Sequence, residues 1–259
     1  MEQSGKIFLK WVYTPADFFE VKITDLLPDY EHIIENGEIT VSMDLDEYQR
    51  NPNIQDQLHE FFFSYFKGAN LTIQKPFTLK QAGGQIIYPD GRKGYILQAE
   101  AAIFMTSFGS VDFCVIDSGG KIKIDTKQAR LNRTRRYGVL AVKYRRLDPV
   151  VESLLSSFEK SRNNPKTELV HLYEIRDSLS TRFDGKKNAI QKLGISEDNW
   201  VTLGRLADNE PFNQGRHSGK HIGALRDATE RELKEARDIA VEIVFAYLEY
   251  LERNASNTQ

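Results

Sequence analysis

Residues 148–165, DPVVESLLSSFEKSRNNP, mark the point at which the chain changes from strand patterns to helix patterns. Asp148 is a good helix cap, and proline is favoured directly after a cap because that position needs no N–H donor. Apolar residues then recur at helical spacing until the Asn-Asn-Pro break at residues 163–165. The stretch therefore predicts a helix that begins after Asp148 and ends before Pro165.

The residues after this stretch predict further helices. Thr167 precedes a run of leucine and isoleucine residues at helical spacing, which Gly185 ends. Ser196 can cap another helix. Thr229 and Glu232 have the spacing of a capping box at the start of the longest helix. We therefore expect the C-terminal part of the chain to be a helical bundle.

The first 146 residues predict mainly strands and tight turns. Three runs rich in β-branched and aromatic residues are KIFLKWVY at 6–13, DFFEVKIT at 17–24 and EITVSMD at 38–44. Asn-Gly at 36–37 is a strong hairpin signal, and the glycine-containing turns at 89–91 and 118–120 favour two more hairpins. Because hairpins join antiparallel neighbours, we expect an antiparallel sheet.

Together these patterns predict an α+β protein, with an antiparallel β-rich N-terminal domain that contains one helix, followed by a C-terminal α-helical bundle. The single helix of the first domain is expected at about residues 53–67, where apolar and aromatic residues recur at helical spacing. We place a β-rich recognition or sensor domain at 1–147, the bundle at 148–253 and a disordered tail at 254–259.

The composition is typical of a globular protein, with 259 residues, 40% hydrophobic residues and a formal net charge of −2. No run of 18 apolar residues is present and the first residues do not form a secretory signal, so we expect a cytoplasmic protein with no membrane partner. Cys114 is the only cysteine, which excludes an intrachain disulfide and a zinc site built from thiolates. We expect no cofactor and no bound metal.

The small net charge hides an uneven distribution. Residues 1–66 contain 4 Lys/Arg and 13 Asp/Glu, a net of −9, whereas residues 67–147 contain 15 Lys/Arg and 5 Asp/Glu, a net of +10. If the two stretches form neighbouring strands, these charges can pair with each other. If they form separate faces, the basic face can attract polyanions.

Residues 213–221, NQGRHSGKH, hold two of the five histidines of the chain. Arg216 and His221 have the spacing Rx4H, which resembles the motif of HEPN domains, a family of helical bundles that includes many metal-independent ribonucleases. The resemblance covers only the C-terminal half. It implies that His221 transfers protons, that Arg216 binds the phosphate and that His217 orients the phosphate or the other histidine. It also implies a homodimer, in which two copies of the motif form one cleft.

Other interpretations of the same residues stay open. Gly215 and Gly219 favour a turn between two helices, so the segment can be only a connection. His217 and His221 are spaced as a metal-binding pair, but they lack an evident third ligand. The flanking residues 203–229 are also similar to the C-terminal region of uncharacterised bacterial proteins, which implies a bacterial source.

A second candidate site lies at 127–146, KQARLNRTRRYGVLAVKYRR, which contains eight Lys/Arg and no acidic residue. Basic residues interleaved with Tyr137 and Tyr144 can hold a nucleic-acid backbone and stack on bases. The alternative is a solvated strand or the outer face of a domain junction. The candidate RNA-binding residues are Arg133, Arg135, Arg136, Lys143, Arg145 and Arg146.

Pro89-Asp90 followed by Asp125 and Lys127 also resembles the PD-(D/E)xK nuclease signature, although the hairpin turn explains Pro89-Asp90 better. Two functional hypotheses therefore remain. The first is a HEPN-like protein that cleaves or binds RNA without a metal, in a bacterial toxin or antiphage defence system. The second is a non-enzymatic module that binds a ligand or protein and dimerises through its bundle.

Overall fold

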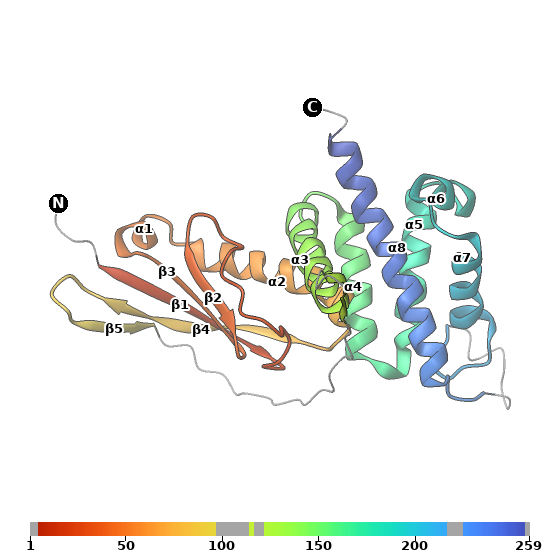
Figure 1. Cartoon of the computed structure of the whole chain (residues 1–259), viewed down its shortest axis with the longest axis horizontal. Helices are drawn as coiled ribbons and strands as arrows, with labels where there is room; N and C mark the ends of the chain where they lie inside the picture. Colours follow the sequence, from red (N-terminus) through yellow and green to blue (C-terminus); the bar gives the residue numbers. More distant parts are fainter. Residues whose placement is uncertain (1–4, 97–113, 117–121, 217–224, 257–259) are drawn as a thin grey trace. The chain divides into compact units, whose positions relative to one another are not determined.

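The structure, a computed structural model, describes residues 5–96, 114–116, 122–216 and 225–256 (Figure 1). It confirms the α+β class, with an antiparallel sheet in the N-terminal region and mainly helices after it. The chain forms two compact units. The first comprises Met1–Phe63 and Lys75–Val111, and the second comprises Ser64–Gln74 and Asp112–Gln259.

The first unit is built on a five-stranded antiparallel sheet with the strand order β2-β3-β1-β4-β5. Each neighbouring pair is antiparallel, as the hairpin signals predict. The five strands are β1 (Lys6–Thr14), β2 (Glu31–Glu35), β3 (Glu38–Asp44), β4 (Thr78–Ile87) and β5 (Lys93–Ile96).

Two of the predicted hairpins are confirmed together with their turns. Asn36 and Gly37 both have positive φ, 52° and 85°, so the β2–β3 turn has the backbone that Asn-Gly favours. Gly91 has φ 83° in the β4–β5 turn. The third pair joins β6 (Cys114–Ile116) to β7 (Ile122–Asp125), but its turn residues 118–120 lie outside the described residues.

One face of the five-stranded sheet forms the core of the first unit. Burial alternates along β1, so that Ile7, Leu9 and Trp11 are buried on the same face. The Trp11 ring packs edge-on against Phe62, with 5.3 Å between ring centres. Phe62 belongs to α2 (Ile54–Ile73), which confirms the predicted helix and extends it, and a short helix α1 (Leu45–Arg50) follows β3.

The strand predicted at 17–24 is wrong. This segment is irregular and makes only one isolated bridge, between Ile23 and Ile34. Its aromatic residues are used for packing instead, because Phe18 is buried and its ring lies 5.3 Å from that of Phe77. A strand would place Phe18 and Phe19 on opposite faces, whereas here their rings contact each other at 5.0 Å.

The second unit is a helical bundle with one continuous apolar core. The predicted caps are confirmed: Asp148 accepts from the N–H of Val150 at 2.8 Å, and Ser196 accepts from that of Asn199 at 3.4 Å. The helices are α3 (Thr126–Tyr144), α4 (Pro149–Asn163), α5 (Glu168–Arg182), α6 (Lys186–Leu193), α7 (Glu197–Gly204) and α8 (Glu230–Ser256).

The structure differs from the predicted domain limits at three places. Most of the basic stretch 127–146 forms helix α3 rather than a strand, and the stretch belongs to the second unit, not to the domain predicted at 1–147. The end of α2 from Ser64 also belongs to the second unit. Helix α8 continues to Ser256, into the segment predicted as a disordered tail. Within the described residues, no helix is long and apolar enough to cross a membrane.

Helices α2 and α3 approach closely in the second unit because each has a glycine at the contact. A Cβ at Gly68 would clash with the backbone oxygen of Tyr137 and with the Ala141 side chain. A Cβ at Gly138 would lie 2.5 Å from the buried ring of Tyr65. Because neither glycine has a side chain, the two helices can pack at this short distance.

We predict that Gly68→Ala lowers the free energy of unfolding by about 1–3 kcal/mol, because the methyl group has no room beside the α3 backbone. Helix propensity alone would give the opposite sign, a gain of about 1 kcal/mol. The control is Val139→Ala on the exposed side of α3, expected to change the value by less than about 0.5 kcal/mol. Urea unfolding measures both, and a stabilised Gly68→Ala protein would contradict the packing described.

Candidate functional site

Arg216 is the one residue of the predicted catalytic set that the structure describes, and its backbone is fixed by a π-helical turn. Helix α7 continues into this turn, Arg205–Asn209, in which the N–H of Glu210 donates to the oxygen of Arg205 at 3.0 Å. The wider turn leaves the oxygen of Ala207 to accept from the N–H of Arg216 at 2.9 Å. His217 and His221 lie outside the described residues.

The chain segments on either side of residues 217–224 are hydrogen-bonded to each other. Phe212 and Arg226 form a parallel bridge, in which the N–H of Asn213 donates to the Arg226 oxygen and the N–H of Arg226 donates to the Pro211 oxygen, both at 3.0 Å. The guanidinium carbon of Arg226 also lies 4.4 Å from the centre of the Phe212 ring. Hydrogen bonds therefore hold the chain both before and after Arg216.

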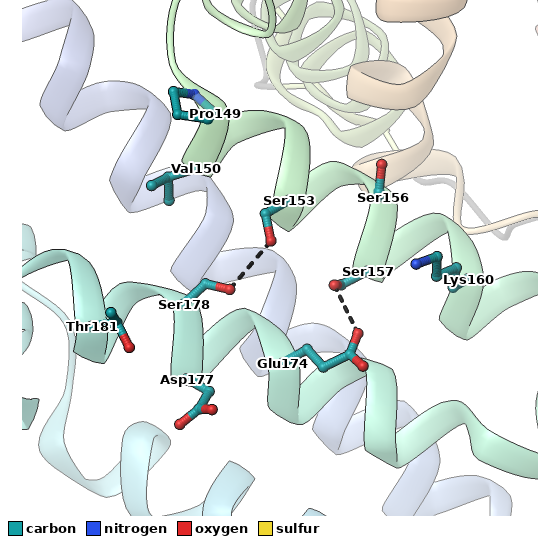
Figure 2. Close-up of a pocket in the computed structure, with 10 residues that line it drawn as sticks. All are labelled: Pro149, Val150, Ser153, Ser156, Ser157, Lys160, Glu174, Asp177, Ser178 and Thr181. Carbon is teal, nitrogen blue, oxygen red and sulfur yellow. Dashed lines mark hydrogen bonds between the residues drawn. The ribbon is translucent and has the colours of Figure 1, made fainter.

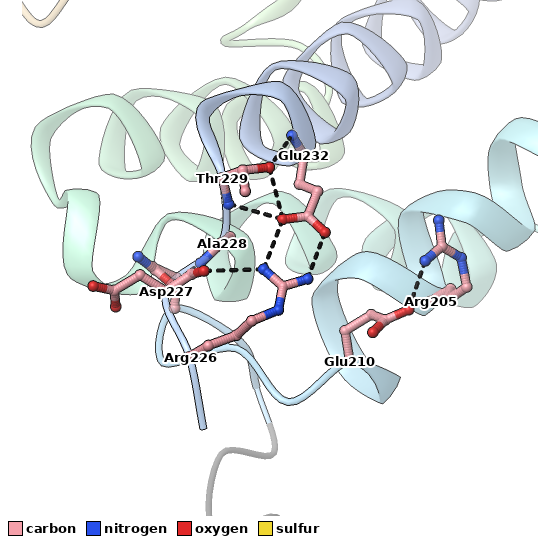
Figure 3. A network of polar contacts seen from close by, with 8 residues as sticks. Arg205, Glu210, Arg226, Asp227, Ala228, Thr229 and Glu232 are labelled. Atoms are coloured by element: carbon pink, nitrogen blue, oxygen red, sulfur yellow. Dashed lines mark hydrogen bonds and ion pairs between the residues drawn. The ribbon is translucent and has the colours of Figure 1, made fainter. Parts of the chain in front are cut away.

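Arg226 connects this closure to the start of α8 (Figure 3). Its guanidinium donates to both carboxylate oxygens of Glu232, at 2.9 and 2.7 Å. Glu232 accepts in turn from the N–H of Thr229, and its own N–H donates to the Thr229 hydroxyl, which confirms the predicted capping box. The hydrogen bond from Arg226, followed by that from Thr229, lowers the pKa of Glu232 to about 2.

We predict that Glu232→Gln destabilises the protein by about 1–2 kcal/mol at pH 7, because it removes the charged acceptor of Arg226. The ordinary pKa of a glutamate is 4.5 and the folded value is about 2. The wild-type advantage is therefore complete above pH 4.5 and is lost as the pH falls from 4.5 towards 2. Urea unfolding at several pH values measures the difference.

The matched control is Glu235→Gln, which removes the same charge from an exposed position on the same helix. We expect it to change the free energy of unfolding by less than about 0.5 kcal/mol. A constant difference between wild type and Glu232→Gln from pH 7 to pH 2 would show that the ion pair with Arg226 does not carry this stability.

The side chain of Arg216 is exposed and lies against an aromatic ring. Its guanidinium carbon is 4.8 Å from the centre of the Tyr173 ring on α5. The guanidinium carbon of Arg176 is 5.3 Å from the same ring centre, and 5.5 Å from that of Trp200. In the part of the chain that the structure describes, neither guanidinium has a carboxylate within ion-pairing distance. Two positive charges therefore share one aromatic surface.

Sequence reasoning missed both Tyr173 and Arg176. They are three residues apart on α5, and this spacing indicates a shared face of the helix. The sequence does not show that Arg216, which follows the π-helical turn, lies against that face. Gly204 was missed as well. A Cβ at Gly204 would clash with the Arg176 guanidinium, so glycine is needed for Arg176 to lie where it does.

Three of the six predicted RNA-binding residues on α3 and just after it are paired with acidic residues. Arg136 and Lys143 form ion pairs with Glu249 and Glu252 of α8, at 3.3 and 2.9 Å. Four further arginines complete the set. Arg145 is largely buried and pairs with Glu152 at 2.7 Å, and Arg133 lies over the Phe245 ring. Arg135 and Arg146 are exposed. The acidic residues of α8 and α4 thus neutralise much of the charge of this stretch.

The two tyrosines of the basic stretch are not available to stack on bases. Tyr137 and Tyr144 are 6% and 7% exposed, and the Tyr137 ring stacks on Phe245 with 3.6 Å between ring centres. Burial and a hydrogen bond to Glu249 raise the pKa of Tyr137 to about 12. The prediction that they stack on bases is therefore wrong, because an amphipathic helix turns both rings into the core of the bundle.

The two aspartates of the PD-(D/E)xK pattern each have a local structural role. Asp90 pairs with Arg92 inside its own hairpin turn, and Asp125 caps α3 by accepting from the N–H of Gln128 at 2.9 Å. Among the described residues, no group of three or more His, Cys, Asp or Glu is placed to hold a metal ion.

A groove of about 550 Å³ runs between α4 and α5 (Figure 2). Its hydroxyl groups are used within the protein, since Ser153 lies 3.3 Å from Ser178 and Ser157 donates to Glu174 at 3.0 Å. The groove is lined by Pro149, Val150, Ser153, Ser156, Ser157, Lys160, Glu174, Asp177, Ser178 and Thr181.

Ser156 of this groove accepts a hydrogen bond from the buried Lys67 at 2.8 Å, a contact that resembles a serine–lysine nucleophile pair. Lys67 also forms ion pairs with Glu152 at 3.0 Å and Glu159 at 3.2 Å. The two carboxylates, the lysine and the hydroxyl thus form one ion-pair network inside the bundle. The contact is structural, and Arg216 remains the stronger candidate.

Comparison of the chain with protein-family models, curated proteins and solved structures finds no match.

Proposed function

We propose that the helical bundle is a HEPN-like module that binds RNA through Arg216 and cleaves it without a metal ion. The observation that supports this best is the placement of Arg216. Its backbone is fixed by Ala207, its guanidinium lies against Tyr173, and no carboxylate of the described residues neutralises it. A fixed, exposed guanidinium is suited to binding a phosphate with two parallel hydrogen bonds.

The chemistry follows from the residues of the Rx4H motif. One imidazole, that of His221, takes the proton from a ribose 2′-hydroxyl or gives one to the leaving 5′-oxygen. The 2′-oxygen then forms a bond to phosphorus as the bond to the 5′-oxygen breaks, which leaves a 2′,3′-cyclic phosphate and a 5′-hydroxyl. Arg216 stabilises the charge that develops on the phosphate oxygens, and His217 orients the phosphate or the other histidine.

The proposal includes a homodimer, because the resembling domains bring two copies of the motif into one cleft. A toxin or antiphage defence role is proposed by association with that family alone. Helix α3 has a smaller part than its charge suggests, because Arg136, Lys143 and Arg145 are held by carboxylates.

We predict that the purified protein cleaves single-stranded RNA in the presence of a chelator. Arg216→Ala is expected to lower the cleavage rate by about 10²–10³-fold, because it removes the group that stabilises the phosphate charge. His221→Ala is expected to lower it by about 10²–10⁴-fold, because proton transfer is lost. Gel analysis of a labelled RNA measures the rate, and the products should carry 2′,3′-cyclic phosphate ends.

The matched control is Arg231→Ala, which removes an exposed arginine from the start of α8 and should leave the rate unchanged. RNA in which every 2′-hydroxyl is methylated should stay intact. Absence of cleavage by the wild type, or equal cleavage by Arg216→Ala and His221→Ala, would remove the nuclease proposal.

A second candidate is the non-enzymatic module that binds a ligand or protein and dimerises through its bundle. The observation that favours it is helix α3, whose charge is neutralised in part and whose two tyrosines are buried, so that they give no stacking surface for RNA. If the wild type does not cleave or bind RNA, this second proposal takes the place of the first.

A further inference from the structure

Arg176 is held in place by the fold, and no carboxylate of the described residues pairs with it. Its side chain is only partly exposed, it contacts the rings of Tyr173 and Trp200, and it lies against the bare backbone of Gly204. Its Nε is buried and has no hydrogen-bond acceptor in the part of the chain that the structure describes. A buried donor without an acceptor is unfavourable, so hydrogen bonds within the fold do not explain why this arginine stands here.

Arg176 and Arg216 are also close enough to act on one ligand. Their guanidinium carbons lie 5.3 and 4.8 Å from the same ring centre, so the two carbons are at most about 10 Å apart. Because this distance does not exceed about the screening length at 0.1 M salt, the two charges still repel each other. An anion bound between them would relieve this repulsion.

We infer that Arg176 is a second phosphate-binding residue, and that Arg176 and Arg216 together bind two neighbouring phosphate groups. The inference rests on the proposed function for its RNA substrate, although the same two guanidinium groups would also bind inorganic pyrophosphate. Tyr173 is the positioning residue, because its ring contacts both arginines. Gly204 permits this arrangement by leaving room for Arg176.

Salt dependence of binding tests the inference directly, because each phosphate contact with single-stranded nucleic acid contributes about 0.7 to the slope of log K against log salt. The probe is a fluorescent 2′-O-methyl RNA of twelve nucleotides, which the protein cannot cleave. We expect Arg176→Gln and Arg216→Gln each to reduce the slope by about 0.7 and the double variant by about 1.4. The control, Lys187→Gln at an exposed position on α6, should keep the wild-type slope.

Two further variants separate charge from folding. Gly204→Ala keeps every charge but displaces the Arg176 guanidinium, so it should reduce the slope as Arg176→Gln does. Arg176→Lys keeps a positive charge and should keep the slope, while binding becomes severalfold weaker because a lysine cannot make two parallel hydrogen bonds. These variants test the inference even if Arg176→Gln does not fold.

The outcomes distinguish this inference from the proposed function. A smaller slope for Arg216→Gln with an unchanged slope for Arg176→Gln and Gly204→Ala would overturn the inference and leave the proposed function intact. If RNA is not bound at all, the melting temperature with pyrophosphate decides. Stabilisation that requires both arginines supports the inference without the RNA function, and stabilisation that requires neither overturns it.

Discussion

The hydrogen-bonded closure between Phe212 and Arg226 is the constraint on which the candidate site depends. It joins the end of the π-helical turn to the start of α8, and the ion pair from Arg226 to Glu232 anchors it to the cap of that helix. The backbone of Arg216 is therefore held in place on the bundle. Because the chain is already ordered at this point, binding an anion costs less conformational entropy than ordering a free segment.

Much of the fold could be predicted because its signals are local. Asp148, Ser196 and the pair Thr229 and Glu232 cap their helices as their spacing indicates, and Asn36-Gly37 forms the expected turn. Helix α3 was missed because its basic residues hide a narrow apolar stripe, and because its stabilising partners, the acidic residues of α8, lie more than one hundred residues away in the chain. The strand at 17–24 failed because the sequence does not show that Phe18 packs against Phe77.

The candidate site was predictable only in part. The Rx4H spacing identified Arg216, but the residues that position its guanidinium come from another helix. Tyr173 and Arg176 belong to no sequence motif. The need for glycine at position 204 becomes clear only from the structure, in which the Arg176 side chain lies against it. The basic stretch on α3 gave the opposite error, because composition counts charges and does not show which of them are already paired.

The central claim is that Arg216 is an ordered anion-binding group. NMR of the arginine Nε–H groups tests it most directly, with the Arg216 signal assigned by Arg216→Lys and an uncleavable 2′-O-methyl RNA added stepwise. The account predicts that the Arg216 signal is resolved in the free protein and moves in proportion to binding as the RNA is added. A signal averaged with those of solvent-exposed arginines, and unmoved at saturating RNA, would contradict it.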